Sequence, residues 1–178
     1  MNEMMRTPTF GYLEVNTVLF AEKVCSALAD MGGAEYSVIR ESFGEGTLNT
    51  LNPVILFIEF SGKIIGNYVL SLDASTAAAL VGADATRLSG AADRDVREEF
   101  SGYLKEVLNV AVGRAIGGLE KKFGDLTFLP ATIVYGEIEF PRFMGASIEI
   151  EGREGKLLCG ILLNMGSFEN REETRKNV

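Results

Sequence analysis

The sequence contains no histidine and no tryptophan, and only two cysteines among its 178 residues. Without histidine, Ser-His and Cys-His nucleophile pairs and the usual zinc and iron ligand sets are excluded. Cys25 and Cys159 lie far apart and form no C-x-x-C motif, so neither a disulfide framework nor a thiolate metal site is predicted. Glycine-rich phosphate loops are absent as well. We therefore expect chemistry based on carboxylates, amides, hydroxyls or the backbone, and no metal or cofactor held by this chain.

Positive charge is also scarce, because 17 Lys and Arg residues face 25 Asp and Glu, for a formal net charge of −8 and a pI near 4.7. Nucleic acids and anionic membranes attract clustered basic residues, so we expect neither as a partner. No segment approaches about 20 uninterrupted apolar residues, and the first ten residues lack the apolar run of a signal peptide. These features predict a cytoplasmic protein. We expect a single domain at 1–168 and a frayed charged tail at 169–178.

The spacing of apolar residues and turn residues predicts two long helices and a series of antiparallel strands. The expected elements are a helix at 12–31, a strand at 36–41, a loop at 43–52, a hairpin at 53–60 and 63–72 joined by Ser61-Gly62, a short helix at 73–81, a linker at 82–92, a helix at 93–123, an extended segment at 126–135, and a hairpin at 145–151 and 156–164.

The order of these elements occurs twice, which predicts an internal pseudo-repeat at about 12–81 and 93–165. Gly62-Lys63-Ile64-Ile65 recurs as Gly155-Lys156-Leu157-Leu158, in the second strand of each expected hairpin. We therefore predict an α+β fold of two similar halves, each a long helix plus antiparallel strands, with the helices packed on an antiparallel sheet.

The helix at 93–123 has two clearly different sides. Its apolar side, which must face the core, contains Val96, Phe100, Tyr103, Leu104, Val107, Leu108, Ala111 and Ala115. The opposite side contains Asp95, Glu98, Glu99, Gly102, Glu106, Asn109, Gly113, Gly117 and Glu120. Glycine inside a helix costs about 0.8 to 1 kcal/mol relative to alanine, so the glycines on this side need a reason.

Two explanations of these glycines fit the pattern. In the first, a neighbouring helix of the same domain packs tightly on them, and Glu106 and Asn109 are merely solvated. In the second, the bare backbone around the polar pair lets another molecule approach closely. An assembly protein, in which a second subunit packs on the glycines, is one form of the second explanation.

Glu106-Val-Leu-Asn109, followed by Gly113 and Pro130, resembles the active helix of the CheC, CheX and FliY chemotaxis phosphatases. The family pattern is a Glu, two residues, an Asn, and a Pro about twenty residues later, often with Asp or Ser four positions before the Glu. This sequence has Gly102 at that earlier position and Ser101 beside it. The resemblance implies catalytic roles for Glu106 and Asn109 and partner-binding roles for Ser101, Gly102, Lys105 and Gly113.

Aligning the two long helices places Val18, Glu22, Cys25 and Ala29 opposite Gly102, Glu106, Asn109 and Gly113. The first half thus keeps the Glu and lacks the Asn. CheC-like proteins carry two such sites and CheX-like proteins one, so the sequence is most similar to CheX. Glu22 is expected to be a surface carboxylate and Cys25 a core residue.

The resemblance further implies a hydrolase that acts on the phosphoaspartate of a CheY-like response regulator. In this mechanism Asn109 orients the attacking water, Glu106 pairs with a lysine of the regulator, and the Mg²⁺ ion belongs to the regulator. A homodimer formed through sheet edges is a further expectation. The alternative is a module that binds a response regulator or another signalling protein without catalysis.

Overall fold

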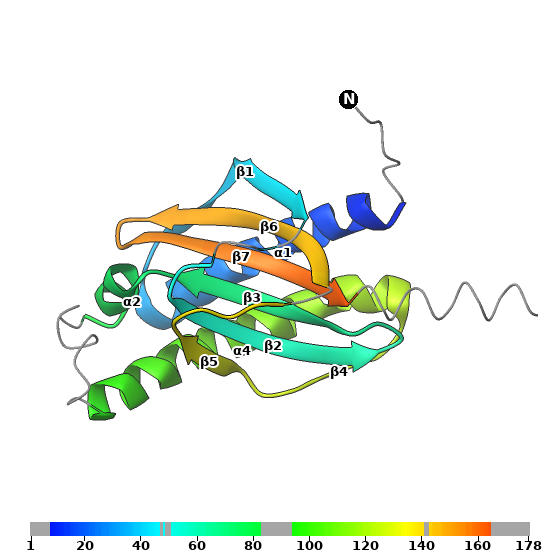
Figure 1. Cartoon of the computed structure of the whole chain (residues 1–178). Helices are drawn as coiled ribbons and strands as arrows, with labels where there is room; N and C mark the ends of the chain where they lie inside the picture. The colour runs from blue at the N-terminus through cyan, green and yellow to red at the C-terminus, as the bar shows by residue number, and fades with distance from the viewer. Residues whose placement is uncertain (1–7, 47, 49–50, 83–93, 141–142, 165–178) are drawn as a thin grey trace, which may run out of the picture.

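The structure is a computed structural model that describes residues 8–46, 48, 51–82, 94–140 and 143–164. Two long helices lie on one face of a seven-stranded antiparallel sheet, and a short helix packs beside it (Figure 1). The elements are α1 (Pro8–Gly32), β1 (Tyr36–Gly46), β2 (Val54–Gly62), β3 (Gly66–Leu72), α2 (Ala74–Leu80), α4 (Arg94–Phe123), β4 (Leu126–Phe128), β5 (Thr132–Tyr135), β6 (Phe143–Gly152) and β7 (Gly155–Asn164). The predicted α+β fold is confirmed. None of the described helices is long and apolar enough to cross a membrane.

Helix ends follow the capping residues in the sequence. α1 begins with Pro8, which suits the first helical turn because its missing N–H would have no partner there. It ends at Gly32, and the next residue, Gly33, has a left-handed φ of +68° and donates its N–H to the Ala29 carbonyl at 3.0 Å. Asp73 caps α2 by accepting from the Thr76 N–H at 2.7 Å. The predicted linker beyond Gly82 and the predicted tail lie outside the described residues.

The two halves of the chain are joined by an exchange of strands. The sheet order is β1-β6-β7-β3-β2-β4, and β5 also pairs with β2. The first strand of the first half therefore pairs with the hairpin of the second half, and β4 and β5 pair with the hairpin of the first half. α1 packs against β1, β6 and β7, whereas α4 packs against β2, β4 and β5. This reciprocal arrangement is that of two similar halves.

The sequence match between the halves does not coincide with the structural repeat. Gly62 ends β2, whereas Gly155 begins β7, so the two similar segments occupy different positions in their hairpins. The four-residue match therefore does not support the predicted pseudo-repeat, which stays a prediction based on the order of the elements.

Strand β1 is longer than predicted, because it continues to Gly46. The prediction of a loop was therefore wrong for residues 43–46. The pairing with β6 is interrupted between Ile39 and Gly44 and then resumes. Ser42 fills the interruption, since its hydroxyl donates to the Ile39 carbonyl at 2.7 Å and accepts from the Glu149 N–H at 2.7 Å. A side chain thus replaces backbone partners across the bulge and lets the glycine-rich segment rejoin the sheet.

The first hairpin is confirmed, but its turn is not at Ser61-Gly62. Those two residues remain in β2 because they pair with Thr127 and Leu126 of β4. The chain reverses at 63–65, where the buried Ile64 side chain anchors the turn.

The extended segment at 126–135 forms two strands, β4 and β5, on either side of Pro130. Proline cannot donate to a sheet, so pairing with β2 stops there and resumes at Thr132. The second hairpin is as predicted, with Gly152 opposite Gly155 around a two-residue turn.

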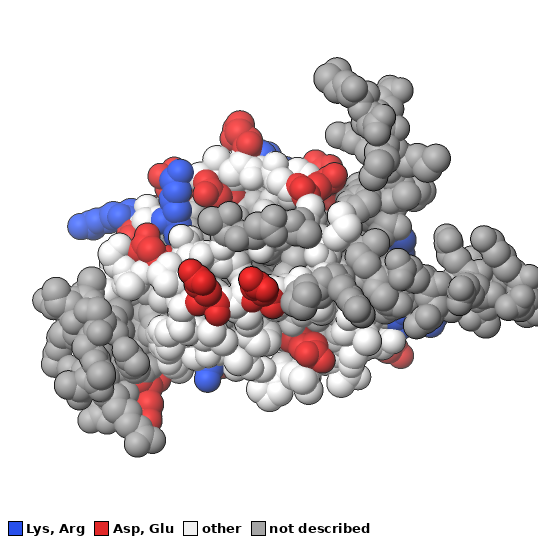
Figure 2. All heavy atoms as spheres, viewed as in Figure 1, with Lys and Arg blue, Asp and Glu red and all other residues white. Residues whose placement is uncertain are grey.

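The main core lies between the helices and the inner face of the sheet. Its largest fully buried side chains include Tyr68, Phe20, Phe60 and Phe100. A smaller apolar cluster covers part of the outer face, where Phe140 packs its ring edge on Phe57. Acidic side chains are scattered over this outer face (Figure 2), and the strand alternation places Glu59, Glu149 and Glu151 on it.

Helices α1 and α4 pack closely at Gly118. A Cβ atom added there would collide with the Asn16 side chain and lie 3.2 Å from Leu19. The backbone carbonyl of Gly118 accepts a hydrogen bond from the Tyr12 hydroxyl, and the Asn16 amide donates to the Tyr12 carbonyl at 2.7 Å. A side chain at position 118 would therefore separate the helices.

We predict that Gly118→Ala lowers the free energy of unfolding by about 1 to 3 kcal/mol, because the added methyl overpacks the helix crossing. Gly117→Ala is the matched control, since its Cβ would meet nothing within 4 Å. That variant should gain up to about 1 kcal/mol from helix propensity alone. Urea denaturation of both variants measures the difference. Equal stabilisation by the two substitutions would contradict the assigned crossing point.

Candidate functional site

Helix α4 buries the side that its sequence predicts. Phe100, Leu104, Val107, Leu108, Ala111 and Ala115 are buried, and Tyr103 is partly buried against the core. Val112, Ile116 and Leu119 extend this buried side toward the C-terminal end of the helix. The helix is therefore held by its core contacts, which fixes the direction of the opposite side. The side chain of Val96 lies outside the described part of the chain.

The opposite side of α4 forms an open strip. Gly102, Glu106, Gly113 and Gly117 are exposed, and Asn109 is half-buried at the edge of the strip. A Cβ atom added at Gly102, Gly113 or Gly117 would meet nothing within 4 Å. No helix among the described residues packs on these glycines, so that part of the chain gives no support to the explanation by a neighbouring helix. The close helix contact instead uses Gly118, which the sequence pattern did not single out.

Ser101, Lys105 and Asn109 form a second line on α4, at i, i+4 and i+8. All three are half-buried, which places this line beside the exposed strip. The Ser101 hydroxyl lies 2.9 Å from the Tyr135 hydroxyl at the end of β5, so the line faces β5. The predicted residues thus divide into an exposed set, Gly102, Glu106 and Gly113, and a flanking set, Ser101, Lys105 and Asn109.

Ser101 does not occupy the position of the missing Gly102 side chain. At 100° per residue, Ser101 and Glu106 are about 140° apart around the helix. Its hydroxyl is also engaged with Tyr135. The strip therefore has no side-chain oxygen one turn before Glu106.

Exposed apolar side chains lie on both sides of Pro130, and one of them, Tyr135, meets the flanking line at Ser101. Phe128 is 45% exposed, Leu129 55% and Tyr135 41%. Sequence reasoning marked Pro130 but gave no role to Leu129 or Tyr135. Neither belongs to a motif, and their exposure depends on how β4 and β5 pair with β2. The only signal in the sequence for this exposure is Pro130, which interrupts the apolar segment at 126–135.

The corresponding surface of α1 is built differently. Glu22, the counterpart of Glu106, accepts a hydrogen bond from Arg40 of β1 at 3.2 Å. Cys25 is half-buried and packs against the core, as expected. Val18 and Ala29 replace the two glycines with side chains. The first half therefore lacks the amide, the free carboxylate and the bare backbone of the α4 strip.

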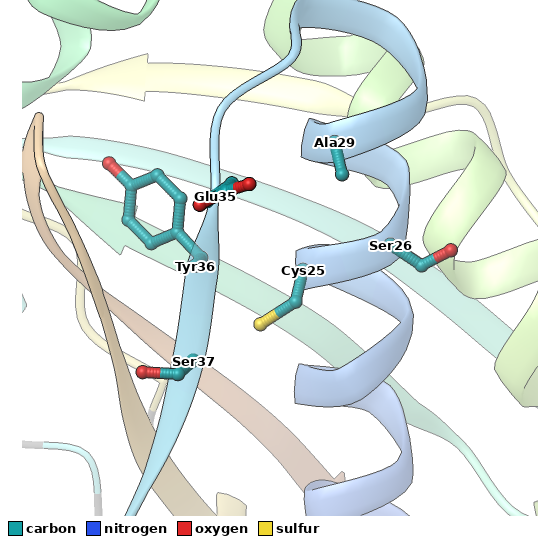
Figure 3. A pocket seen from close by; sticks show the side chains of 6 residues that line it. All are labelled: Cys25, Ser26, Ala29, Glu35, Tyr36 and Ser37. Atoms are coloured by element: carbon teal, nitrogen blue, oxygen red, sulfur yellow. The ribbon is translucent and has the colours of Figure 1, made fainter.

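A pocket of about 600 Å³ opens between α1 and the start of β1. Figure 3 shows the Cys25 sulfur pointing toward β1 within it, and the lining residues are Cys25, Ser26, Ala29, Glu35, Tyr36 and Ser37. Burial raises the pKa of the Cys25 thiol to about 11, so the thiol is neutral at physiological pH. The pocket therefore offers no thiolate nucleophile.

Arg114 connects the two long helices beside the strip. Its guanidinium donates to the Ser26 hydroxyl at 3.0 Å and to the Asp30 carboxylate at 2.8 Å. Arg114 is thereby directed toward α1 and away from Asn109. Among the residues that the structure describes, no group of three acidic or thiol side chains could hold a metal ion.

Comparisons with known proteins agree on the fold. No protein-family model matches the sequence, and neither does any curated protein. Solved structures do match, among them the chemotaxis protein CheX from Vibrio vulnificus, with 15% identity and a TM-score of 0.63 over 82% of this chain and 96% of that one. FliY from Thermotoga maritima has 16% identity and a TM-score of 0.61, over 96% and 97% of the two chains.

A further match is the complex of CheX with CheY, BeF₃ and Mg²⁺ from Borrelia burgdorferi. The matched chain of that complex is 19% identical to this chain, with a TM-score of 0.57 over 82% of this chain and 94% of the matched one. This chain therefore has the fold of the CheC, CheX and FliY structures. The resemblance indicated by Glu106, Asn109 and Pro130 is confirmed at the level of the fold.

We predict that Cys25 reacts with iodoacetamide at pH 8 about 100-fold more slowly in the folded protein than in the unfolded chain. The reason is the raised pKa, because moving it from 9.0 to about 11 lowers the thiolate fraction by that factor. Alkylation rates from peptide mass mapping, with and without denaturant, test this. The rate should climb as the pH approaches 11. Equal rates in the folded and unfolded states would contradict the assignment of Cys25 as unreactive.

Proposed function

We propose that this protein accelerates hydrolysis of the phosphoaspartate of a CheY-like response regulator. The observation that carries the proposal is the open strip of α4, where Glu106 and Asn109 are flanked by glycines at which an added Cβ atom would meet nothing within 4 Å. The similarity in fold to a CheX that forms a complex with CheY supports this class of partner.

Asn109 is assigned the water-positioning role. Its amide oxygen accepts a hydrogen bond from water and its amide nitrogen donates to a phosphoryl oxygen, so one side chain can align water for in-line attack. The amide needs no shifted pKa for this task. The half-burial of Asn109 restricts its rotamers, which favours a defined direction for the amide.

Glu106 is assigned the anchoring role. Its exposed carboxylate can pair with a lysine ammonium of the regulator, one helical turn from Asn109. Glu22 illustrates the contrast, since its carboxylate is already engaged by Arg40. The bare backbone at Gly102 and Gly113 would let the regulator approach the helix closely enough for both contacts.

Mg²⁺ and the phosphorylated carboxylate are assigned to the regulator. A metal on the partner neutralises charge that develops on the phosphoryl oxygens, and this chain then supplies orientation rather than covalent chemistry. Every step assigned to Asn109 and Glu106 therefore requires the docked complex.

A non-catalytic binding module is the second candidate, and a specific observation favours it. Gly102 offers no side-chain oxygen, and the neighbouring Ser101 hydroxyl is directed toward Tyr135. Catalytic amounts of the protein separate the two functions. A phosphatase shortens the regulator's phosphoryl half-life at one part protein to fifty parts regulator, whereas a sequestering module cannot turn over.

We predict that Asn109→Ala lowers the rate of catalysed dephosphorylation about 100-fold, as expected when a group that orients a reactant is removed. Asn109→Asp should be similarly impaired, because it keeps the size and loses the amide donor. Loss of ³²P from the labelled regulator measures the rate, and circular dichroism checks the fold. Wild-type rates in both variants would rule out the water-positioning role.

We predict that Glu106→Ala lowers kcat/KM by at least about tenfold, with a weaker affinity for the regulator, because a charge-assisted contact is lost. Glu106→Gln should behave like Glu106→Ala if pairing with a lysine is the role. Glu22→Ala is the matched control on α1 and should retain full activity, since Glu22 is held by Arg40. Equal losses from the Glu22 and Glu106 variants would instead indicate two working surfaces.

A further inference from the structure

Lys105 lies on α4 immediately before the anchoring residue Glu106 and one helical turn before the water-positioning residue Asn109. The family resemblance implies that it binds the partner, but no particular contact has been assigned to it. It is half-buried on the flanking line with Ser101 and Asn109. Its ammonium has no hydrogen bond or ion pair with any described residue. A lysine held in this way keeps its charge available to a molecule that docks on the helix.

The surroundings of Lys105 explain why the charge is unpaired. The residues three and four positions away on α4 are Ser101, Gly102, Leu108 and Asn109, and none carries a carboxylate. The facing strand β5 contains Thr132, Ile133, Val134 and Tyr135, again without an acid. Glu106 is the next residue along the helix and points about 100° away.

The outer face of the sheet differs from the surroundings of Lys105 because it carries several carboxylates. It carries Glu59, Glu149 and Glu151 at outward positions, and acidic side chains are scattered across it in Figure 2. An anionic group is repelled there. The flank of α4 beside Asn109 therefore combines an unpaired cation with an amide donor, on the side of the molecule opposite this acidic face.

We propose that Lys105 contacts a phosphoryl oxygen of the docked regulator and makes this surface distinguish the phosphorylated form from the unphosphorylated one. The inference rests on the proposed function and adds to it the residue that reads the phosphoryl group. Side chains at i and i+4 have Cβ atoms about 5 to 6 Å apart, so the Lys105 ammonium and the Asn109 amide can reach one phosphoryl group together. Lys105 thus selects the substrate form while Asn109 directs the water.

Binding to a CheY-like regulator with and without beryllium fluoride, a mimic of the acyl phosphate, tests this. Wild-type protein should prefer the activated form, and Lys105→Gln should reduce that preference roughly tenfold by weakening only the activated complex. Lys105→Arg keeps the charge and should retain the preference. Lys121→Gln is the matched control, because Lys121 is an exposed lysine on the same helix about 24 Å away along its axis.

Three outcomes would overturn the inference. If Lys105→Gln binds both forms of the regulator as wild-type protein does, Lys105 makes no contact with the phosphoryl group. If the variant binds both forms more weakly by the same factor, Lys105 contributes through its aliphatic stem and not through its charge. If Lys121→Gln has the same effect as Lys105→Gln, the effect is one of overall charge. In these three cases dephosphorylation by wild-type protein still supports the proposed function. If wild-type protein neither prefers the activated form nor accelerates hydrolysis, both the Lys105 inference and the proposed function are wrong.

Discussion

The antiparallel pairing of β3 with β7 is the contact on which the rest of the structure depends. Seven pairs, from Gly66 with Leu163 to Leu72 with Leu157, join the two halves at the centre of the sheet. Because each half also pairs its first strands with the other half's hairpin, both long helices fall on the same face. α4 then buries one side against the sheet and α1, and its polar side is left open. The position of the candidate site is therefore a consequence of how the halves pair.

The sequence predicted those parts of the fold that depend on local physics. Periodicity defined both long helices, and the predicted start of the short helix at residue 73 coincides with the cap that Asp73 forms in the structure. The errors occurred where a distant segment decides the outcome. Ser61-Gly62 resembles a turn in isolation and becomes a strand because β4 pairs with it. Phe43 to Gly46 resembles a loop and rejoins the sheet because Ser42 bridges the bulge to β6.

The candidate site shows the same division. Burial on one side of α4 and exposure of Gly102, Glu106 and Gly113 follow from helical spacing, and both were predictable. The close contact at Gly118, the bond between Ser101 and Tyr135, and the capture of Glu22 by Arg40 were not. Each joins segments whose proximity no periodicity reveals. The catalytic roles of Glu106 and Asn109 stay predictions, because they concern a partner that docks on the strip.

The exchange of strands between the halves also has a consequence for how the chain reaches its native state. Tyr36 of β1 finds its partner only when Gly152 of β6 has been made, so most of the chain must leave the ribosome before this edge can close. Contacts of such long sequence separation slow folding, because the entropy of loop closure is lost before the pairing is gained. Until then the strands of the first half expose unpaired edges. Association with another nascent chain competes with native pairing during that interval.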